Sequence, residues 1–310
     1  ATVAFPSDGT GKEPVKVAFA SGKGGTGKTT VAVNIANILQ QTGTDIQLLD
    51  CDVEEPNAHL FLLPRIAWSI PATVRRPEVA EEHCTGCGVC AEFCEYKAIT
   101  VFKNTVIVFP ELCHGCGVCS EFCPERIITE TDRAIGVIEG GAAGGIGFVQ
   151  GRLNVGEALA PPLIRQVKKK APAAAVTLVD CPPGTSCPVI EAVRDMDLVV
   201  LVSEPTPFGF YDLTLMAATL KTLSIPSGVV VNRCDIGNDE LYLFCRREGL
   251  PILAEIPHDR RIAECYSHGA LITEALPEYR ELFADLWKQV STLLPSRPDR
   301  EGRDGTGTPP

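Results

Sequence analysis

One glycine-rich stretch limits what this chain can fold into more than any other part of the sequence. Residues 21–30 are SGKGGTGKTT, and from Gly22 to Thr29 they fit the pattern G-x-x-x-x-G-K-[ST]. An apolar run precedes the stretch, and a helical pattern begins at Val31. In such a loop the glycines let backbone N–H groups converge on phosphate oxygens, Lys28 reaches the β- and γ-phosphates, and Thr29 offers a hydroxyl to Mg²⁺. A glycine cluster alone would indicate an ordinary turn, but strand, loop and helix in this order predict a phosphate-binding loop at a helix N-terminus.

A second lysine makes this loop more specific. The sequence K-G-G-x-G-K-T-T begins at Lys23 and resembles the deviant Walker A motif of the MinD/Mrp/nitrogenase-iron-protein class of P-loop ATPases. In that class the additional lysine crosses a dimer interface, so the resemblance implies that Lys23 contacts the nucleotide of a partner protomer. Elsewhere a lysine would be expected to lie in solvent. The resemblance also implies ATP hydrolysis and a nucleotide bound by the whole loop: Gly22, Lys23, Gly24, Gly25, Thr26, Gly27, Lys28, Thr29 and Thr30.

Composition excludes several classes of protein. The chain has 310 residues, of which 22% are charged and 45% hydrophobic, which is typical of soluble globular proteins. The net charge of −11 argues against a nucleic-acid partner, because phosphate backbones are bound by clustered lysine and arginine. No apolar run reaches the ~18–20 residues of a membrane-spanning helix, and the basic-then-apolar order of a signal peptide is missing. We therefore expect a cytoplasmic protein without stable membrane insertion.

Strand and helix patterns alternate along most of the chain. After the loop, a helix is predicted from Val31 to a cap at Gly43. The later predicted strands are 46–49, 176–179, 198–202, 229–231 and 252–256, and the predicted helices are 161–170, 208–223, 239–248, 260–268 and 277–294. Alternation of this kind indicates an α/β fold, a doubly wound and mostly parallel P-loop NTPase sheet that binds ligands outside the carboxyl ends of its strands.

The alternation stops between about residues 64 and 133. We expect a discontinuous P-loop ATPase domain at 15–63 and 134–294, with an inserted domain at 64–133. The ends, 1–14 and 295–310, are rich in Gly, Pro and polar residues and are expected to form a flexible lead-in and a disordered tail. The glycine-rich segment 140–145 is expected to return the chain to the main domain, with a second phosphate loop as the alternative.

The inserted segment holds an internal repeat of cysteines. Residues 84–94 are CTGCGVCAEFC, and residues 113–124 are CHGCGVCSEFCP. Each half has the spacing C-x₂-C-x₂-C-x₃-C, which is associated with bacterial iron–sulfur ferredoxins. Zinc sites more often pair two C-x₂-C units or include histidine, and disulfide frameworks are typical of small secreted domains. These eight of the chain's 14 cysteines are therefore predicted to bind iron–sulfur clusters, with zinc as the alternative.

Residues 80–132 resemble two-cluster bacterial ferredoxins, including an apolar hairpin at 99–109. The resemblance implies a small α+β ferredoxin-like domain whose halves exchange their fourth ligand. One [4Fe–4S] cluster would be held by Cys84, Cys87, Cys90 and Cys123, and the other by Cys113, Cys116, Cys119 and Cys94. Glu95 follows Cys94 where the motif prefers proline, and His114 is expected to be an exposed loop residue and not a ligand. The resemblance favours redox chemistry or cluster traffic, with a purely structural role as the alternative.

Two predicted strands end in aspartates. Asp50 and Asp52 follow the first strand after the loop, where this ATPase class places switch I, and Asp180 begins D-C-P-P-G-T, which resembles switch II of Mrp-like proteins. The resemblance implies that Asp52 orients the attacking water and that Gly184 senses the γ-phosphate through its amide. Asp50, Asp52 and Asp180 would join Thr29 around Mg²⁺, directly or through water. Capping of the next turn is the alternative role for Asp50 and Asp52.

Three strand-end segments complete the predicted site. Asn232 and Arg233 match the place where this class contacts adenine through an asparagine, and Pro257 begins a segment that resembles its second base-side loop. The segment 203–209 resembles the loop before the next helix. Because Asn, Pro and Asp are also common turn formers, these assignments are less specific than the first loop.

The remaining cysteines have no ligand spacing. Cys187 lies seven residues after Asp180, a position similar to that of a cluster ligand in the nitrogenase iron protein. A buried structural cysteine is the favoured interpretation, and a bridging cluster is the alternative. The others are expected to be core or surface thiols: Cys51, Cys181, Cys234, Cys245 and Cys265.

Together these residues resemble MinD/Mrp-type ATPases that carry an inserted two-cluster ferredoxin domain. The resemblance implies an ATP-dependent homodimer, or a heterodimer with a related ATPase, and a redox or metallocluster client. Assembly or maturation of a metallocluster or metalloprotein is the favoured function, and a nucleotide-gated electron donor like the nitrogenase iron protein is the main alternative. MinD-like positioning at a membrane is disfavoured because the last residues show no amphipathic targeting helix.

Overall fold

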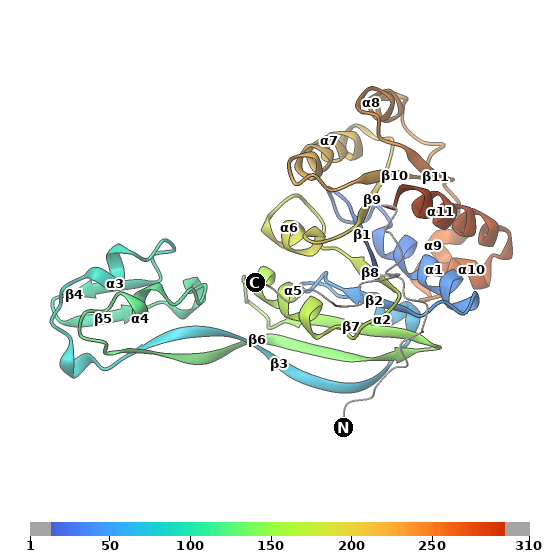
Figure 1. Ribbon diagram of the computed structural model, residues 1–310. Helices are drawn as coiled ribbons and strands as arrows, with labels where there is room; N and C mark the ends of the chain where they lie inside the picture. The colour runs from blue at the N-terminus through green and yellow to red at the C-terminus, as the bar shows by residue number, and fades with distance from the viewer. Residues whose placement is uncertain (1–13, 295–310) are drawn as a thin grey trace, which may run out of the picture.

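A nine-stranded sheet forms the centre of the computed structural model, which describes residues 14–294 (Figure 1). Its order is β11-β10-β9-β1-β8-β2-β7-β6-β3. Neighbouring strands from β11 to β7 are parallel. These strands are β1 Val15–Ala20, β2 Ile46–Asp50, β7 Ile146–Leu153, β8 Val176–Asp180, β9 Leu198–Ser203, β10 Ser227–Asn232 and β11 Ile252–Ile256. Because helices cover both faces, the inner strands are apolar on both sides.

Helices cover both faces of this sheet, which confirms the predicted doubly wound α/β fold (Figure 1). One face packs against α1 Lys28–Gln41, α9 Arg260–Ser267, α10 Ile272–Ala275 and α11 Arg280–Leu293. The other packs against α5 Ala160–Lys170, α6 Cys187–Val193, α7 Pro207–Thr222 and α8 Glu240–Glu248. The predicted helix at 277–294 is in fact two elements, because the 3₁₀ turn η3 Pro277–Tyr279 precedes α11. Among residues 14–294 no helix combines the length and the apolarity that crossing a bilayer requires.

Two long antiparallel strands, β3 Arg65–Val79 and β6 Ile128–Ala143, extend the sheet beyond its parallel part. The sequence did not indicate them. The predicted boundary between residues 133 and 134 lies inside β6, because this strand is continuous from the main sheet to the inserted segment. Beyond the part of β6 that pairs with β7, both strands continue outward as a two-stranded ribbon (Figure 1).

Residues 140–145 lie at the end of the strand that brings the chain back from the inserted segment to the main sheet, so the alternative of a second phosphate loop is wrong. Residues 140–143 belong to β6, and Gly144 and Gly145, with φ of 55° and 98°, form the turn to β7. A Cβ on Gly140 would lie 2.1 Å from Trp68 Cζ2, so glycine is required where β3 is bulged against β6. The segment is therefore part of a hairpin in the main sheet, and not a phosphate loop.

The ribbon carries residues 80–127 away from the main body (Figure 1). We call this segment the cysteine module. It contains η1 Glu81–His83, α3 Val89–Glu92, β4 Ile99–Phe102, β5 Thr105–Val108, η2 Pro110–Leu112 and α4 Val118–Glu121. The pairing of β4 with β5 confirms the predicted hairpin, and the module has its own small core around Cys90, Ile99 and Val106. The predicted lead-in and tail lie outside the described residues, except for Pro14.

Candidate functional site

The predicted phosphate loop lies between β1 and α1. Gly27, the N-cap of α1, has a φ of 96°, in the left-handed region that glycine adopts freely. The hydroxyl of buried Ser21 donates to the Lys23 carbonyl at 2.6 Å and turns the loop back on itself. A Cβ on Gly22 would lie 2.3 Å from the Cβ of Asp212, so α7 packs directly on the loop. The loop is thus held at Gly22 by α7, whereas Gly24 and Gly25 face open space.

Carboxylates converge beside the loop at the carboxyl ends of β2 and β8. Asp50 and Asp180 are paired across these neighbouring parallel strands. Thr29 Oγ1 donates to Asp180 Oδ2 at 2.6 Å, and Asp180 Oδ1 is buried without a hydrogen-bond partner in the described part of the chain. Such an oxygen next to a threonine hydroxyl suits a hard cation, so this pair fits the predicted Mg²⁺. Asp50 Oδ2 instead accepts 3.0 Å bonds from the amides of Asn57 and Ala58, as in the capping alternative.

Burial raises the pKa of all three acids. The pKa of Asp52 is raised to about 7, although Lys28 acts in the opposite direction. Burial raises the pKa of Asp180 to about 6, against the effects of Lys28 and Thr29. The pKa of Asp50 is raised well above its ordinary value by burial and by the nearby Asp180. Because the carboxyls resist ionisation here, the site favours an added positive charge.

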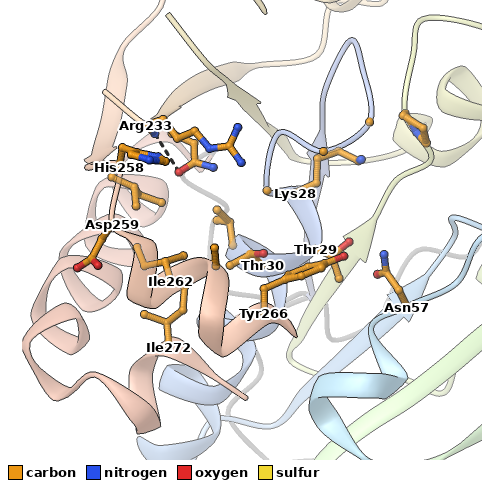
Figure 2. Close-up of a pocket in the computed structure, with 18 of the residues that line it drawn as sticks. Lys28, Thr29, Thr30, Asn57, Arg233, His258, Asp259, Ile262, Tyr266 and Ile272 are labelled. Carbon is orange, nitrogen blue, oxygen red and sulfur yellow. Dashed lines mark hydrogen bonds between the residues drawn. The ribbon is translucent and has the colours of Figure 1, made fainter. Parts of the chain in front are cut away.

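A cavity of about 380 Å³ opens beside the loop (Figure 2). Its volume lies in the range of small-molecule sites. It is lined by much of the predicted site: Gly24, Gly25, Gly27, Lys28, Thr29, Thr30, Asp52, Asn232, Arg233 and Pro257. The other predicted residues lie outside its lining: Gly22, Lys23, Thr26, Asp50, Asp180 and Gly184.

Apolar residues that the sequence did not indicate complete the wall. Ile262 and Tyr266 come from α9, and Ile272 begins α10. In Figure 2 these three lie around Thr30, with Ile272 below it, while Arg233 and His258 lie above it. Ile262 and Tyr266 are one helical turn apart, so their shared helix face is visible in the sequence, but the docking of that face beside α1 is not. An apolar wall between polar ends suits a nucleobase and its sugar.

Lys23 is not part of the cavity lining of its own chain. Its Nζ lies 3.3 Å from Glu204 Oε2, and Glu204 Oε1 accepts a 2.7 Å bond from Arg233 Nη1. The Glu204 side chain is 6% exposed, whereas those of Lys23 and Arg233 are 34% and 43% exposed. A buried carboxylate thus joins the phosphate loop to a residue of the predicted base side. Sequence reasoning assigned no role to Glu204.

Asn232 faces the loop. Its Nδ2 donates to the Thr26 carbonyl at 2.8 Å, and its Oδ1 accepts a 3.0 Å bond from the Arg233 amide. A Cβ on Gly27 would lie 2.7 Å from Nδ2, so glycine at this position lets Asn232 approach. The side chain holds the loop in place, and its contact with a base stays a prediction.

The switch II segment contacts the loop through its backbone. The Gly184 amide donates to the Ser21 carbonyl at 3.0 Å, so its contact with a γ-phosphate also stays a prediction. Cys187 is exposed, and its interpretation as a buried structural thiol is wrong. As the first residue of α6 it lies outside the helix face that packs inward through Val189, Ala192 and Val193. The other cysteines without ligand spacing are buried or half-buried: Cys51, Cys181, Cys234, Cys245 and Cys265.

The eight predicted ligands line two separate cavities in the cysteine module. One cavity is lined by Cys84, Cys87, Cys90 and Cys123, and the other by Cys94, Cys113, Cys116 and Cys119. Each cavity joins three cysteines of one run to the fourth of the other. Among residues 14–294 no three His, Cys, Asp or Glu side chains converge as they would around a single metal ion. His114 is exposed, as predicted, and its ring stacks on Tyr96 with centroids 3.6 Å apart.

Residues 17–272 match the profile of the CbiA family, the CobQ/CobB/MinD/ParA nucleotide binding domain. The chain belongs to this family. The CbiA-type domain covers the phosphate loop, both switch segments and the base-side loops, and the chain is therefore a P-loop ATPase of the MinD/ParA type.

Two relatives of this CbiA-family chain and one solved structure are similar to it over most of its length. An uncharacterized protein of Methanocaldococcus jannaschii is 31% identical over 282 residues, which are 90% of this chain and 98% of the relative. An iron–sulfur cluster carrier protein of Pyrococcus horikoshii is 24% identical over 303 residues, 90% of this chain and 87% of the relative. The solved cell division ATPase MinD of Pyrococcus furiosus has a TM-score of 0.57 at 20% identity, over 91% of this chain and all of that chain, and shares the fold.

Proposed function

We propose that this ATPase couples an ATP-dependent dimer cycle to two [4Fe–4S] clusters, in the assembly or maturation of a metallocluster or metalloprotein. The two cysteine cavities carry the proposal. Each is lined by four thiols in the crossed combination typical of two-cluster ferredoxins. The Gly86 amide contacts Cys84 Sγ at 3.4 Å and the Ala98 amide contacts Cys94 Sγ at 3.2 Å, contacts that would favour thiolates. When bound, the clusters would supply electrons or iron–sulfur units.

The chain's own residues have separate roles in ATP hydrolysis. Lys28 lies in the cavity and would bind the β- and γ-phosphates, and Thr29 with Asp180 would hold Mg²⁺. Asp52 lines the same cavity and would orient the attacking water. Its pKa of about 7 would fall further next to Mg²⁺, so Mg²⁺ binding would leave it ionised. Release of the Gly184 amide from Ser21 would free it for the γ-phosphate.

A second protomer is part of the proposal. Lys23 lies outside its own cavity and is partly exposed, so it is available to a neighbouring chain once it leaves Glu204. The partner would be a second copy or a related ATPase.

Cluster delivery is favoured by the likeness to the iron–sulfur cluster carrier of Pyrococcus horikoshii. A nucleotide-gated electron donor is the second candidate, because Cys87 and Cys116 are exposed at the end of a ribbon that carries them away from the ATP site (Figure 1). A cluster with an exposed edge can pass on either an electron or its metal.

Metal content tests the first step. Protein purified without oxygen should contain about eight iron atoms per chain, as two four-iron clusters require. Zinc in place of iron would contradict the proposal.

A second experiment tests cluster transfer. Iron-55-labelled protein should be mixed with an apo-ferredoxin acceptor with ATP, with ADP and without nucleotide. Transferred iron supports assembly. Reduction of an oxidised holo-ferredoxin by the chemically reduced protein, in a nucleotide-dependent way and without iron transfer, supports the electron donor.

A further inference from the structure

The cysteine module exposes a stacked pair of aromatic rings. The Phe93 and Phe122 rings lie 5.0 Å apart at an interplanar angle of 25°, where the short helices α3 and α4 pack against each other. The two residues remain 51% and 53% exposed. Exposed aromatic anchors of this kind are enriched at the centres of protein–protein interfaces.

The pair lies beside both cysteine cavities. Phe93 precedes Cys94 and Phe122 precedes Cys123, and these are the two cysteines that cross between the repeats. A surface centred on the rings therefore includes the residues bonded directly to the fourth ligand of each proposed cluster. A partner bound there would lie near both clusters.

Carboxylates flank both rings in the sequence. Four exposed glutamates lie within three residues of a ring: Glu92, Glu95, Glu121 and Glu125. Lys97 and Arg126 follow at the next turns, so carboxylates outnumber cations two to one. In the described part of the chain none of these six side chains forms an ion pair with another residue. The charges are therefore available to a partner, and their sign agrees with the net charge of −11.

We propose that Phe93, Phe122 and the four flanking glutamates form a docking face for a protein with a basic surface around an apolar centre. The inference rests on the proposed function, since the docking partner would be the client that exchanges electrons or iron–sulfur units with the clusters. Complementary charge would steer the approach and set the orientation, while the rings supply the buried contact. This arrangement would bring the client to both clusters and leave the ATP site free.

The test uses a basic c-type cytochrome as the probe, titrated calorimetrically at low ionic strength with both proteins oxidised, so that no electron moves. The Glu92→Gln, Glu121→Gln double variant should bind the probe about tenfold more weakly and with a smaller salt dependence. The matched control is Glu81→Gln with Glu111→Gln, which removes the same charge from exposed positions of the same module. The control should bind like the unaltered protein, and equal weakening in both variants would overturn the proposal.

The aromatic part is tested separately. Phe93→Ala with Phe122→Ala should weaken binding by about tenfold, whereas Phe102→Ala, which removes another exposed ring of the module, should not. Iron content and ATP turnover check that each variant is intact. If the phenylalanine variant loses iron, the result of the glutamate pair still tests the proposal.

Equal binding of an acidic flavodoxin would overturn the assignment to a basic partner. A change in self-association of the glutamate variant in sedimentation would overturn it in favour of a second copy. Absence of iron from the unaltered protein would contradict the proposed function, while eight irons with no effect of the variants would contradict only the docking face.

Discussion

At the scale of single residues, Glu204 links two parts of the ATPase site. Its two oxygens bond Lys23 and Arg233, and only 6% of its side chain is exposed. Replacing it with glutamine leaves two cations without their carboxylate, so Glu204→Gln should lower the free energy of unfolding by ~1–3 kcal/mol in urea titrations. Glu248 is the matched control, since it also pairs with two cations, Lys221 and Arg247, but at an exposed position. Glu248→Gln should change stability by less than ~1 kcal/mol, and equal effects would contradict a buried link.

Asp259 gives a prediction for pH. Its Oδ1 accepts the Arg261 amide at 2.8 Å and caps α9, and its Oδ2 accepts the Tyr279 hydroxyl at 2.8 Å. The hydrogen bonds from Arg261 hold the pKa of Asp259 well below its usual range. A carboxyl with a lowered folded pKa stabilises the fold above its unfolded pKa of about 3.9, and this contribution is lost as the pH falls through the folded pKa.

The Asp259→Asn variant should therefore be less stable than the unaltered protein near neutral pH. The difference in the free energy of unfolding should shrink as the pH falls below about 4. Urea unfolding across this range checks the sign, and Glu274→Gln, which removes an exposed carboxylate, is the control. A difference for Asp259→Asn that stays constant with pH would contradict this role.

Sequence patterns predicted residues whose chemistry depends on local spacing. The phosphate loop and the eight cysteines are of this kind, because a loop or a ligand run is defined within about ten residues. Glu204, Asn57 and Tyr266 could not be predicted in the same way. Their roles depend on how α9, the switch I segment and β9 meet at the edge of the sheet, and no local spacing specifies that meeting.

At the scale of elements, a row of polar residues crosses the sheet. Asp180, Asp50, Gln150 and Glu139 occupy paired positions on β8, β2, β7 and β6. Gln150 is buried, and its Nε2 donates to Glu139 Oε2 at 2.8 Å. The row therefore joins the acids of the proposed Mg²⁺ site to the strand that continues into the ribbon. The row could not be predicted from the sequence because β6 and β7 were not predicted. Their glycines interrupt the alternation of apolar and polar residues that is expected of strands.

This row predicts a response of β6 to nucleotide. We expect Mg²⁺ and ATP to slow amide hydrogen exchange in residues 136–143, because ligation at Asp180 fixes the register of the neighbouring strands. In Gln150→Leu the slowing should be confined to β8 and β2. Ser291→Ala, a change on the exposed part of α11, is the control and should respond like the unaltered protein. A β6 that does not respond in the unaltered protein would contradict the coupling.

At the scale of the whole molecule, the ATP site and the cysteine module lie far apart along one continuous framework (Figure 1). Strands β3 and β6 pair from Arg65 and Ala142 in the main sheet to Val79 and Ile128 at the cysteine module, with register shifts after Ile66 and after Ala72. Such a ribbon transmits a change in direction better than a flexible linker does. Nucleotide-driven pairing of two protomers would therefore reposition the modules as well as the ATP sites.

Pairing itself is tested at Lys23. Because this side chain lies outside its own cavity, Lys23→Ala should retain ATP binding within a few-fold but lose the ATP-dependent dimer in sedimentation velocity. Lys28→Ala, which removes a cation from inside the cavity, should lose both binding and dimer formation. Lys221→Ala removes an exposed lysine and should dimerise like the unaltered protein. A dimer of the unaltered protein that forms equally well with and without ATP would contradict a role for Lys23 across the interface, because its exchange from Glu204 to a partner's phosphate would then contribute nothing to assembly.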